Sequence, residues 1–260
     1  MSERRAFYFD GESSLDYGLY ISGNQTFNAP KKKLTKVSVP GRNGDLVFFD
    51  GSYENYDYKY DSFLVSNLNY RIREFNEWLM SKNGYFRLED DYHPEIYRMA
   101  MFKGPIDFDV ILLEAGTTTL TFDCKPQKFL KIGEDAINCG AEGQITIIDN
   151  PTKFYATPII KVAGTGTVSF SIEHIDYNPA IYQTTIYGMT MDESKGRTVV
   201  ESEIEQAYYE KTGEYVNNRL ELTNNRFPRL APGLNRVSCH GTSNGASVSS
   251  LEITPRWFSI

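Results

Sequence analysis

The sequence predicts a mainly β protein with a single helix. Aromatic residues make up 14% of the 260 residues, and the 18 tyrosines and 16 phenylalanines far outnumber the 2 tryptophans. Tyrosine and phenylalanine fit the half-buried, pleated surface of a sheet. Turn signals centred on glycine recur along the chain and separate short β-type runs such as Leu46–Phe49 and Val248–Ile253. Many short strands at this spacing are typical of sandwiches and barrels.

The segment from Val39 to Tyr58, VPGRNGDLVFFDGSYENYDY, raises the question of whether its glycines bind a phosphate. A P-loop needs a lysine and a serine or threonine directly after its second glycine, whereas Asp45 follows Gly44 here. The Asn43-Gly44 pair instead favours a tight type I′ hairpin turn. The segment is therefore predicted to bend a strand.

The apolar run Leu46–Phe49 follows that turn. Successive side chains of a strand point to opposite faces, so four apolar side chains in a row favour burial of both faces. A hairpin that buries only one face within its own subunit leaves the other face for a neighbouring copy. We therefore expect much of a contact between subunits to lie between Leu34 and Tyr60.

Three tyrosines alternate with Asp57 and Lys59, so one face of the next strand carries three rings. Two interpretations stay open. The rings form the aromatic face of a sheet that packs on the helix, or they contribute to a subunit contact, where tyrosine is enriched. The hypothetical oligomer interface therefore contains Leu46, Val47, Phe48, Phe49, Tyr56, Tyr58 and Tyr60.

One segment, Asn69–Gly84 (NYRIREFNEWLMSKNG), has the 3.6-residue period of an amphipathic helix. Asn69 can cap its start and Gly84 can close its end. The polar face carries both signs of charge, which argues against a membrane-surface helix. The helix is expected to pack against a sheet through Ile72, Phe75, Trp78 and Leu79.

The segment Asp90–Glu95 (DDYHPE) contains residues that could in principle bind a metal. Its donors would be Asp90, Asp91, His93 and Glu95. However, the spacing is not that of a helical zinc motif, and Pro94 stops a helix that would align the ligands. A charged surface turn is therefore the favoured interpretation, and no metal is predicted.

No other pattern indicates catalysis or a cofactor. Cys124, Cys139 and Cys239 form no CxxC pair and are expected to be small buried hydrophobes. His240 follows Cys239 directly, and neighbours on one strand cannot form a nucleophile pair. No GxSxG or GxGxxG motif occurs. Acidic residues are numerous enough to supply the two carboxylates of a glycosidase, but nothing in the sequence singles out a particular pair. The chain is predicted not to be an enzyme.

The formal net charge of −7 argues against a surface that coats nucleic acid. The short basic run Lys31–Lys33 is expected to mark a solvated turn or strand edge. The sequence has no apolar run of membrane-spanning length and no signal-peptide pattern. We therefore expect a protein that is made and kept in the cytosol until it assembles, without a membrane partner.

A domain boundary is predicted near Lys125–Lys128, where a strand runs into Pro126 and a new series of strands follows Gly133. The predicted domains are residues 1–128 and 129–260.

Several segments, taken in order, resemble the distal tail protein (Dit) family of siphophage tails and related prophages. The N-terminal landmarks are Phe9–Ser14, Tyr17–Leu19, Pro40–Leu46, Trp78-Leu79, Gly84–Leu88, Asp91–Arg98 and Leu120–Gln127. The C-terminal landmarks are Asn150–Thr152, Pro158–Lys161 and Phe227–Asn235. A single one of these segments would not identify the family, but together, in this order, they cover nearly the whole chain.

The resemblance implies an N-terminal, ring-forming β domain with a helix and a projecting hairpin, and a C-terminal galectin-like β-sandwich. It implies a homohexameric ring at the distal end of the tail in the virion, assembled in the host cytoplasm. The implied partners are the tail tube protein, a tail-tip or tail-associated protein and, as a further candidate, a receptor-binding protein. DNA would pass through the channel without specific binding.

Two other functions stay open. The first is a carbohydrate-binding module that recognises host glycans through aromatic residues such as Tyr182, Tyr187 and Trp257. The second is a cell-wall or capsule hydrolase that uses acids around Asp90. The hub function is preferred because it alone accounts for both halves of the chain.

Overall fold

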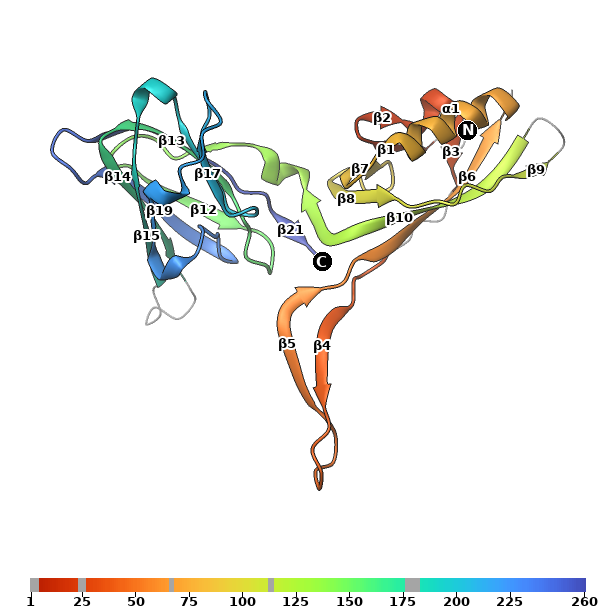
Figure 1. The fold of residues 1–260 in the computed structure, drawn as a ribbon, viewed down its shortest axis with the longest axis horizontal. Coiled ribbons are helices and arrows are strands. Elements are labelled where there is room, and N and C mark those ends of the chain that lie inside the picture. The colour runs from red at the N-terminus through yellow and green to blue at the C-terminus, as the bar shows by residue number, and fades with distance from the viewer. Residues whose placement is uncertain (1–4, 23–26, 66–67, 112–114, 176–182) are drawn as a thin grey trace. The chain divides into compact units, whose positions relative to one another are not determined.

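The computed structural model describes residues 5–22, 27–65, 68–111, 115–175 and 183–260 (Figure 1). Strands dominate these residues, and they contain one α-helix and a few short 3₁₀ turns. The predicted mainly β class with one helix is confirmed. The chain divides into two compact units, Met1–Lys128 with Ile260 and Phe129–Ser259. No described helix is long and apolar enough to cross a membrane.

The N-terminal unit is built on a mostly antiparallel sheet in the order β2-β1-β7-β8-β10-β6-β3, with β9 on β10. The strands are β1 (Phe7–Phe9), β2 (Glu12–Ser13), β3 (Leu19–Ile21), β6 (Tyr56–Val65), β7 (Phe86–Asp90), β8 (Ile96–Phe102), β9 (Asp109–Ile111) and β10 (Ala115–Leu130). The longest pairing joins β6 and β10, from Tyr56 opposite Cys124 to Val65 opposite Ala115. Two central strands of the sheet are therefore locked in one register.

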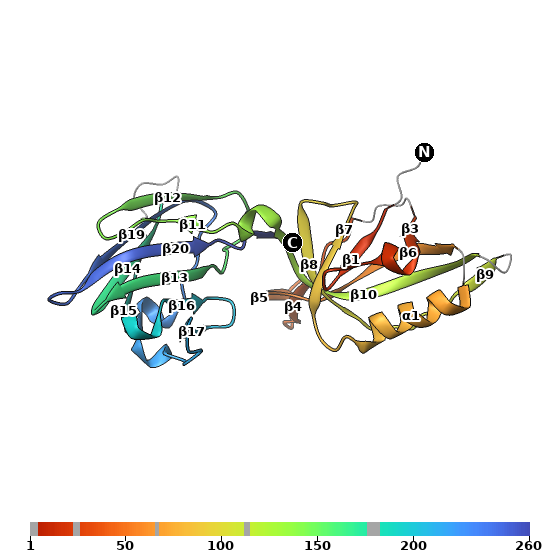
Figure 2. The same cartoon turned by 90° about the horizontal axis from the view of Figure 1, so that it is seen from above.

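The helix α1 (Leu68–Ser81) lies along this sheet (Figure 2). Phe75, Trp78 and Leu79 are buried, as the helical period predicts. The indole ring of Trp78 stacks on Phe7 of β1 at 5.7 Å and on Tyr17 at 4.5 Å between ring centroids. These ring contacts attach the helix to the sheet.

Both predicted helix caps are wrong. The helix begins at Leu68, so Asn69 lies inside its first turn. At the other end, the helix stops at Ser81, and the Ser81 hydroxyl donates to the Trp78 carbonyl at 3.0 Å. Gly84 lies three positions further on with a φ of 120°, and it serves the turn into β7. At this end of the helix, the serine hydroxyl rather than a glycine turn provides a hydrogen bond to a free backbone carbonyl.

The strands β4 (Lys32–Val37) and β5 (Leu46–Tyr53) form a separate two-stranded sheet. Its connection differs from the predicted type I′ turn at Asn43-Gly44, which would need positive φ at both residues. Gly44 has a φ of 80°, but Asn43 is not among the residues with positive φ. The hydrogen-bonded turn instead lies at Val39, whose carbonyl accepts from Arg42 N at 3.1 Å. Pro40 and Gly41 occupy its two central positions, as a type II turn prefers.

The C-terminal unit contains two five-stranded sheets whose orders are β11-β20-β13-β16-β17 and β12-β19-β14-β15-β18. One core, which includes Phe170, Val200 and Leu251, takes side chains from both sheets, so the unit is a β-sandwich. Its strands are β11 (Ile137–Asn138), β12 (Ile145–Asn150), β13 (Ile159–Thr165), β14 (Thr167–His174), β15 (Gln183–Thr190), β16 (Thr198–Glu201), β17 (Gln206–Tyr209), β18 (Leu220–Leu222), β19 (Gly233–Gly241) and β20 (Ser247–Thr254).

Two buried asparagines hold the loop that leads into β19. Asn150 Nδ2 donates to the carbonyls of Phe154 at 2.9 Å and Leu230 at 3.2 Å. Asn235 Nδ2 donates to the carbonyl of Ala231 at 2.9 Å, and its Oδ1 accepts from Ala231 N at 2.9 Å. Buried backbone groups need partners, so these amides take the place of a strand pairing there.

The helix packing gives a first testable prediction. Leu79 is fully buried against the sheet, whereas its neighbour Met80 is 61% exposed. Leu79→Ala is expected to lower the free energy of unfolding by about 2–5 kcal/mol, because it leaves a cavity under α1. Urea unfolding followed by circular dichroism measures the change. Met80→Ala, the control on the exposed face, should shift the free energy of unfolding by about 0.5 kcal/mol or less. Equal losses in both variants would contradict the observed helix orientation.

Candidate subunit interface

The hairpin β4–β5 exposes most of its apolar side chains to solvent. Leu34, Val37, Val47, Phe48 and Phe49 are each between 43% and 59% exposed. In the described part of the chain, β4 and β5 pair only with each other. Figure 1 shows the hairpin extending away from the sheet of its own unit. An isolated two-stranded hairpin is marginally stable in water, so this one needs a further contact.

The strand register distributes the apolar side chains over both faces of the hairpin. Leu34 lies opposite Phe49, and Val37 lies opposite Leu46. Opposed residues share a face, and these two pairs are three residues apart along β4, so they lie on opposite faces. The prediction that both faces of this segment are apolar thus agrees with the register.

Contacts within the hairpin cover only part of this surface. Lys32 Nζ lies 5.2 Å from the centroid of the Phe49 ring, and Phe49 meets Tyr53 edge to face at 5.6 Å. Phe48, on the other face, remains 59% exposed. The large apolar area that remains is the best candidate for a protein contact in the N-terminal unit.

The tyrosines of β6 do not belong to this exposed surface. Tyr56, Tyr58 and Tyr60 are all buried within the N-terminal unit. Tyr60 stacks on Phe7 at 5.1 Å, and Tyr58 meets Tyr60 edge to face at 5.0 Å. Aromatic side chains that are already buried within the single chain have no surface left for contact with a neighbouring subunit. We therefore remove these three tyrosines from the candidate interface, which then consists of Leu46, Val47, Phe48 and Phe49 with Leu34 and Val37.

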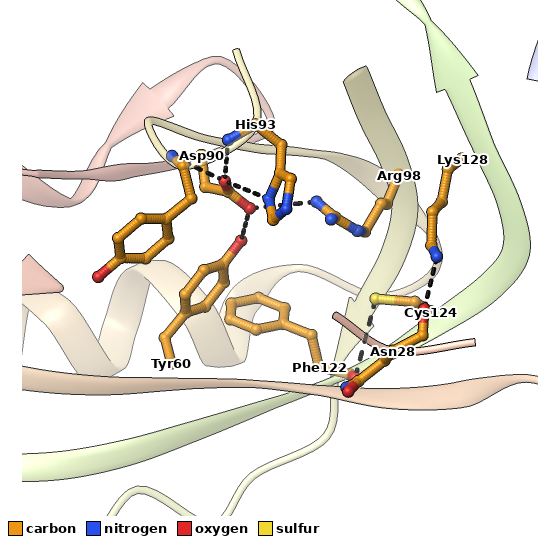
Figure 3. Close-up of polar contacts among 9 residues, drawn as sticks. Asn28, Tyr60, Asp90, His93, Arg98, Phe122, Cys124 and Lys128 are labelled. Carbon is orange, nitrogen blue, oxygen red and sulfur yellow. Dashed lines mark hydrogen bonds and ion pairs between the residues drawn. The ribbon is translucent and has the colours of Figure 1, made fainter. Parts of the chain in front are cut away.

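The segment Asp90–Glu95 is also more buried than a surface turn. The Asp90 carboxylate is fully buried and collects donors from several elements (Figure 3). Tyr60 Oη donates to Asp90 Oδ2 at 2.8 Å, and Arg98 Nη1 donates to the same oxygen at 3.1 Å. His93 N donates to Asp90 Oδ1 at 2.9 Å. The predicted charged surface turn is therefore wrong for Asp90 and His93, because their polar groups form an internal network.

Arg98 is the cation of this network, and it is only 2% exposed. Its guanidinium lies over the Tyr58 ring, 4.2 Å from the centroid. Burial opposes the charge of Arg98, but the tyrosine hydroxyls and Asp90 around it outweigh that effect and raise its pKa above the ordinary value. Burial, and then the charge of Asp90, raise the pKa of Tyr60 well above its ordinary value, so its hydroxyl remains a donor. The network therefore holds strands together and offers no open acid.

The described residues contain no group of three or more histidine, cysteine or acidic side chains that could hold a metal. His93 Nδ1 faces Asp90 Oδ1 at 3.2 Å, and Asp91 accepts from Ala6 N at 2.7 Å. Three of the four candidate ligands, Asp90, Asp91 and His93, are thus engaged in hydrogen bonds within the chain.

All three cysteines are free thiols in buried positions, as the sequence predicts. Burial raises the pKa of Cys124 and of Cys139 to about 12, and it also raises the pKa of Cys239. A thiol with a raised pKa carries little reactive thiolate at neutral pH. On β19, Cys239 points into the core whereas His240 is exposed, so these neighbours form no nucleophile pair.

A family model and a solved structure resemble this chain. Residues 13–124, which lie in the N-terminal unit, match the family model of the phage tail protein RIFT-related domain. The whole chain is similar in fold to the Dit protein of phage SPP1, with a TM-score of 0.69 and 14% identity over 96% of this chain and 98% of that one. That protein is described as a paradigm of the hub of the adsorption apparatus in phages that infect Gram-positive bacteria. These findings confirm the predicted resemblance to distal tail proteins.

Two structures of the phage p2 baseplate, in its activated conformation with calcium and with strontium, are more distant. Each has a TM-score of 0.49 and 10% identity over 96% of this chain and 98% of that chain. No curated protein sequence matches the chain.

The buried network gives a second prediction. Asp90→Ala is expected to lower the free energy of unfolding by about 3–5 kcal/mol, because it leaves the Arg98 guanidinium buried without its counter-charge. Thermal and urea unfolding measure the loss. Asp57 pairs with Lys103 at 2.6 Å on the exposed face of the same sheet. Asp57→Ala is the matched control and should cost less than about 1 kcal/mol. A loss for Asp90→Ala as small as for the control would refute a structural role for the network.

The buried thiols give a third prediction. In the native protein at pH 8, all three cysteines should react with iodoacetamide far more slowly than a free cysteine, because burial keeps them protonated and inaccessible. In urea, all three should react at the ordinary rate. Mass spectrometry counts the modified thiols. Rapid modification of a native cysteine would show that its position is open to solvent.

Proposed function

We propose that the protein is a structural hub component at the distal end of a long, non-contractile phage or prophage tail. The single observation that carries this proposal is a phage tail domain whose projecting hairpin leaves both of its apolar faces exposed in one chain. A hub joins identical copies to one another and to its neighbours, and it therefore needs surfaces that are incomplete in the monomer.

The hairpin supports assembly into a ring. Burial of one valine, leucine or phenylalanine side chain stabilises an association by about 1.5–3 kcal/mol before the costs of binding are met. Six apolar side chains of each hairpin are available for such burial: Leu34, Val37, Leu46, Val47, Phe48 and Phe49. A hairpin that docks on a different surface of the next copy makes a heterologous contact, and such contacts form a ring when the rotation from copy to copy closes on itself. The hexameric number rests on the resemblance to distal tail proteins.

The ring would join the tail tube protein to a tail-tip or tail-associated protein, with a receptor-binding protein as a further candidate partner. DNA would pass through its channel without specific binding, which the formal charge of −7 per chain favours. The location would be the distal end of the tail in the virion, after assembly in the host cytoplasm. The domains 1–128 and 129–260 would be the ring-forming domain and a galectin-like sandwich.

The burial of particular residues weighs against a cell-wall or capsule hydrolase, and against glycan recognition through the aromatic residues that the sequence suggested. Of the aromatic residues considered for glycan recognition, Tyr187 and Trp257 are buried, and Tyr182 lies outside the described residues. The acid at the centre of the hydrolase hypothesis, Asp90, is fully buried beside Arg98. A buried, paired carboxylate cannot approach a polysaccharide chain. We therefore propose a protein without enzymatic activity.

The hairpin gives a fourth prediction. Phe48→Asp and Phe49→Asp are expected to convert rings into soluble monomers, because a charge on either face of the hairpin cannot be buried in a contact. Size-exclusion chromatography with light scattering measures the mass. Ile145→Asp places the same charge at a position that is 64% exposed on β12 and should leave the ring intact. Rings that persist in both hairpin variants would overturn the assignment of the interface.

A further inference from the structure

The C-terminal sandwich contains a pocket of about 260 Å³. Its wall combines the end of β14, the middle of β15 and the turn that follows β18. The volume lies just below the range of about 300–1,000 Å³ typical of sites for drug-sized ligands. A ligand of this pocket would therefore be small, about the size of one sugar ring.

The pocket is positively charged. Arg226 and Arg229 both line it, and both are exposed. Neither guanidinium has an ion pair, a hydrogen bond or an aromatic ring as partner among the residues that the structure describes. Six other described arginines do pair with carboxylates: Arg73, Arg87, Arg98, Arg197, Arg236 and Arg256. In a chain with a net charge of −7, two unpaired guanidinium groups in one pocket mark a site for an anion.

An aromatic ring stands beside these arginines. Tyr155 lines the pocket with 50% of its surface exposed, and its ring packs against the His174 ring at 5.8 Å between centroids. His174 is held in turn by a contact of 3.4 Å between its Nε2 and the Arg229 carbonyl. Since the carbonyl can only accept, Nε2 carries the proton. Burial lowers the pKa of His174, so the ring that supports Tyr155 is neutral at pH 7.

The rim of the pocket is polar and has an unusual backbone. Asn224 supplies an amide that can bond to ligand hydroxyl groups. Asn224 and Asn225 have φ angles of 55° and 52°, in the left-handed region that few residues other than glycine adopt. This turn presents Asn224 and Arg226 on the same pocket. Uncommon backbone conformations of this kind gather at ligand sites.

We infer that this pocket binds a small anionic saccharide. Arg226 and Arg229 would bind its phosphate or carboxylate, the Tyr155 ring would pack against the apolar face of the sugar, and Asn224 would bond to a hydroxyl. A bare anion would use the arginines but leave the tyrosine ring and the amide without a role. A neutral sugar would leave two guanidinium groups without a counter-charge. The inference goes beyond the hub function and does not depend on ring assembly, because one chain supplies every residue.

Binding to the full-length protein tests the inference. Saturation-transfer NMR and isothermal titration would use four probes: glucose 1-phosphate, glucuronate, glucose and inorganic phosphate. We expect one or both acidic sugars to bind at least tenfold more tightly than glucose and inorganic phosphate. A preference between the two acidic sugars identifies the anionic group as phosphate or carboxylate. Failure of both to bind would overturn the inference, and so would equal binding of either simple probe.

Variants then locate the binding site. Arg226→Gln with Arg229→Gln should weaken binding of the acidic sugar at least tenfold, because charge-assisted hydrogen bonds are lost. Tyr155→Ala should weaken it as well. Arg236→Gln removes an exposed arginine that pairs with Glu173 outside the pocket, and it should leave binding unchanged. Circular dichroism confirms that each variant is folded. Unchanged binding in the double arginine variant would place the ligand elsewhere and refute the site.

Discussion

The pairing of β6 with β10 is the contact on which the N-terminal unit depends. Its register turns the rings of Tyr56, Tyr58 and Tyr60 toward the core and turns Asp57 and Lys59 toward water. A shift by one residue would exchange the two faces, with charged groups in the core and rings in solvent, so the register is strongly specified. Strand β6 also anchors the β4–β5 hairpin, because only two residues separate the end of β5 from the start of β6.

The buried pair of Asp90 and Arg98 supplies specificity to this core. Bringing two charges out of water is costly, and their attraction and hydrogen bonds repay that cost only when the geometry is good. Here the geometry links three strands, because Tyr60 lies on β6, Asp90 ends β7 and Arg98 lies on β8. An alternative packing of these strands would leave a buried charge unpaired. The network thus favours one arrangement of the sheet over its competitors.

Reasoning from the sequence recovered the fold class, the helix, the buried cysteines and the two-faced apolar hairpin, because each follows from a local period or composition. It failed where the answer depends on distant residues. The alternation of the tyrosines predicts that they share one face of a strand. It does not show whether that face is covered by the core of the same unit or by a neighbouring subunit. The burial of Asp90 depends on Arg98 and Tyr60, which no spacing rule connects to it. The pocket at Arg226 and Arg229 was missed for the same reason, since Tyr155 and His174 reach it from other parts of the chain.

The lysines of β4 have a consequence for the newly made chain. A two-stranded ribbon leaves a row of unpaired backbone groups along each outer edge, and such edges invite strands of other chains to add without limit. Lys32, Lys33 and Lys36 line one of these edges in an exposed strand. A second identical strand that approached this edge would bring like charges together, and repulsion would discourage a growing stack. The apolar side chains can then remain in solvent until a docking partner arrives, and the free subunit avoids the path to fibrils.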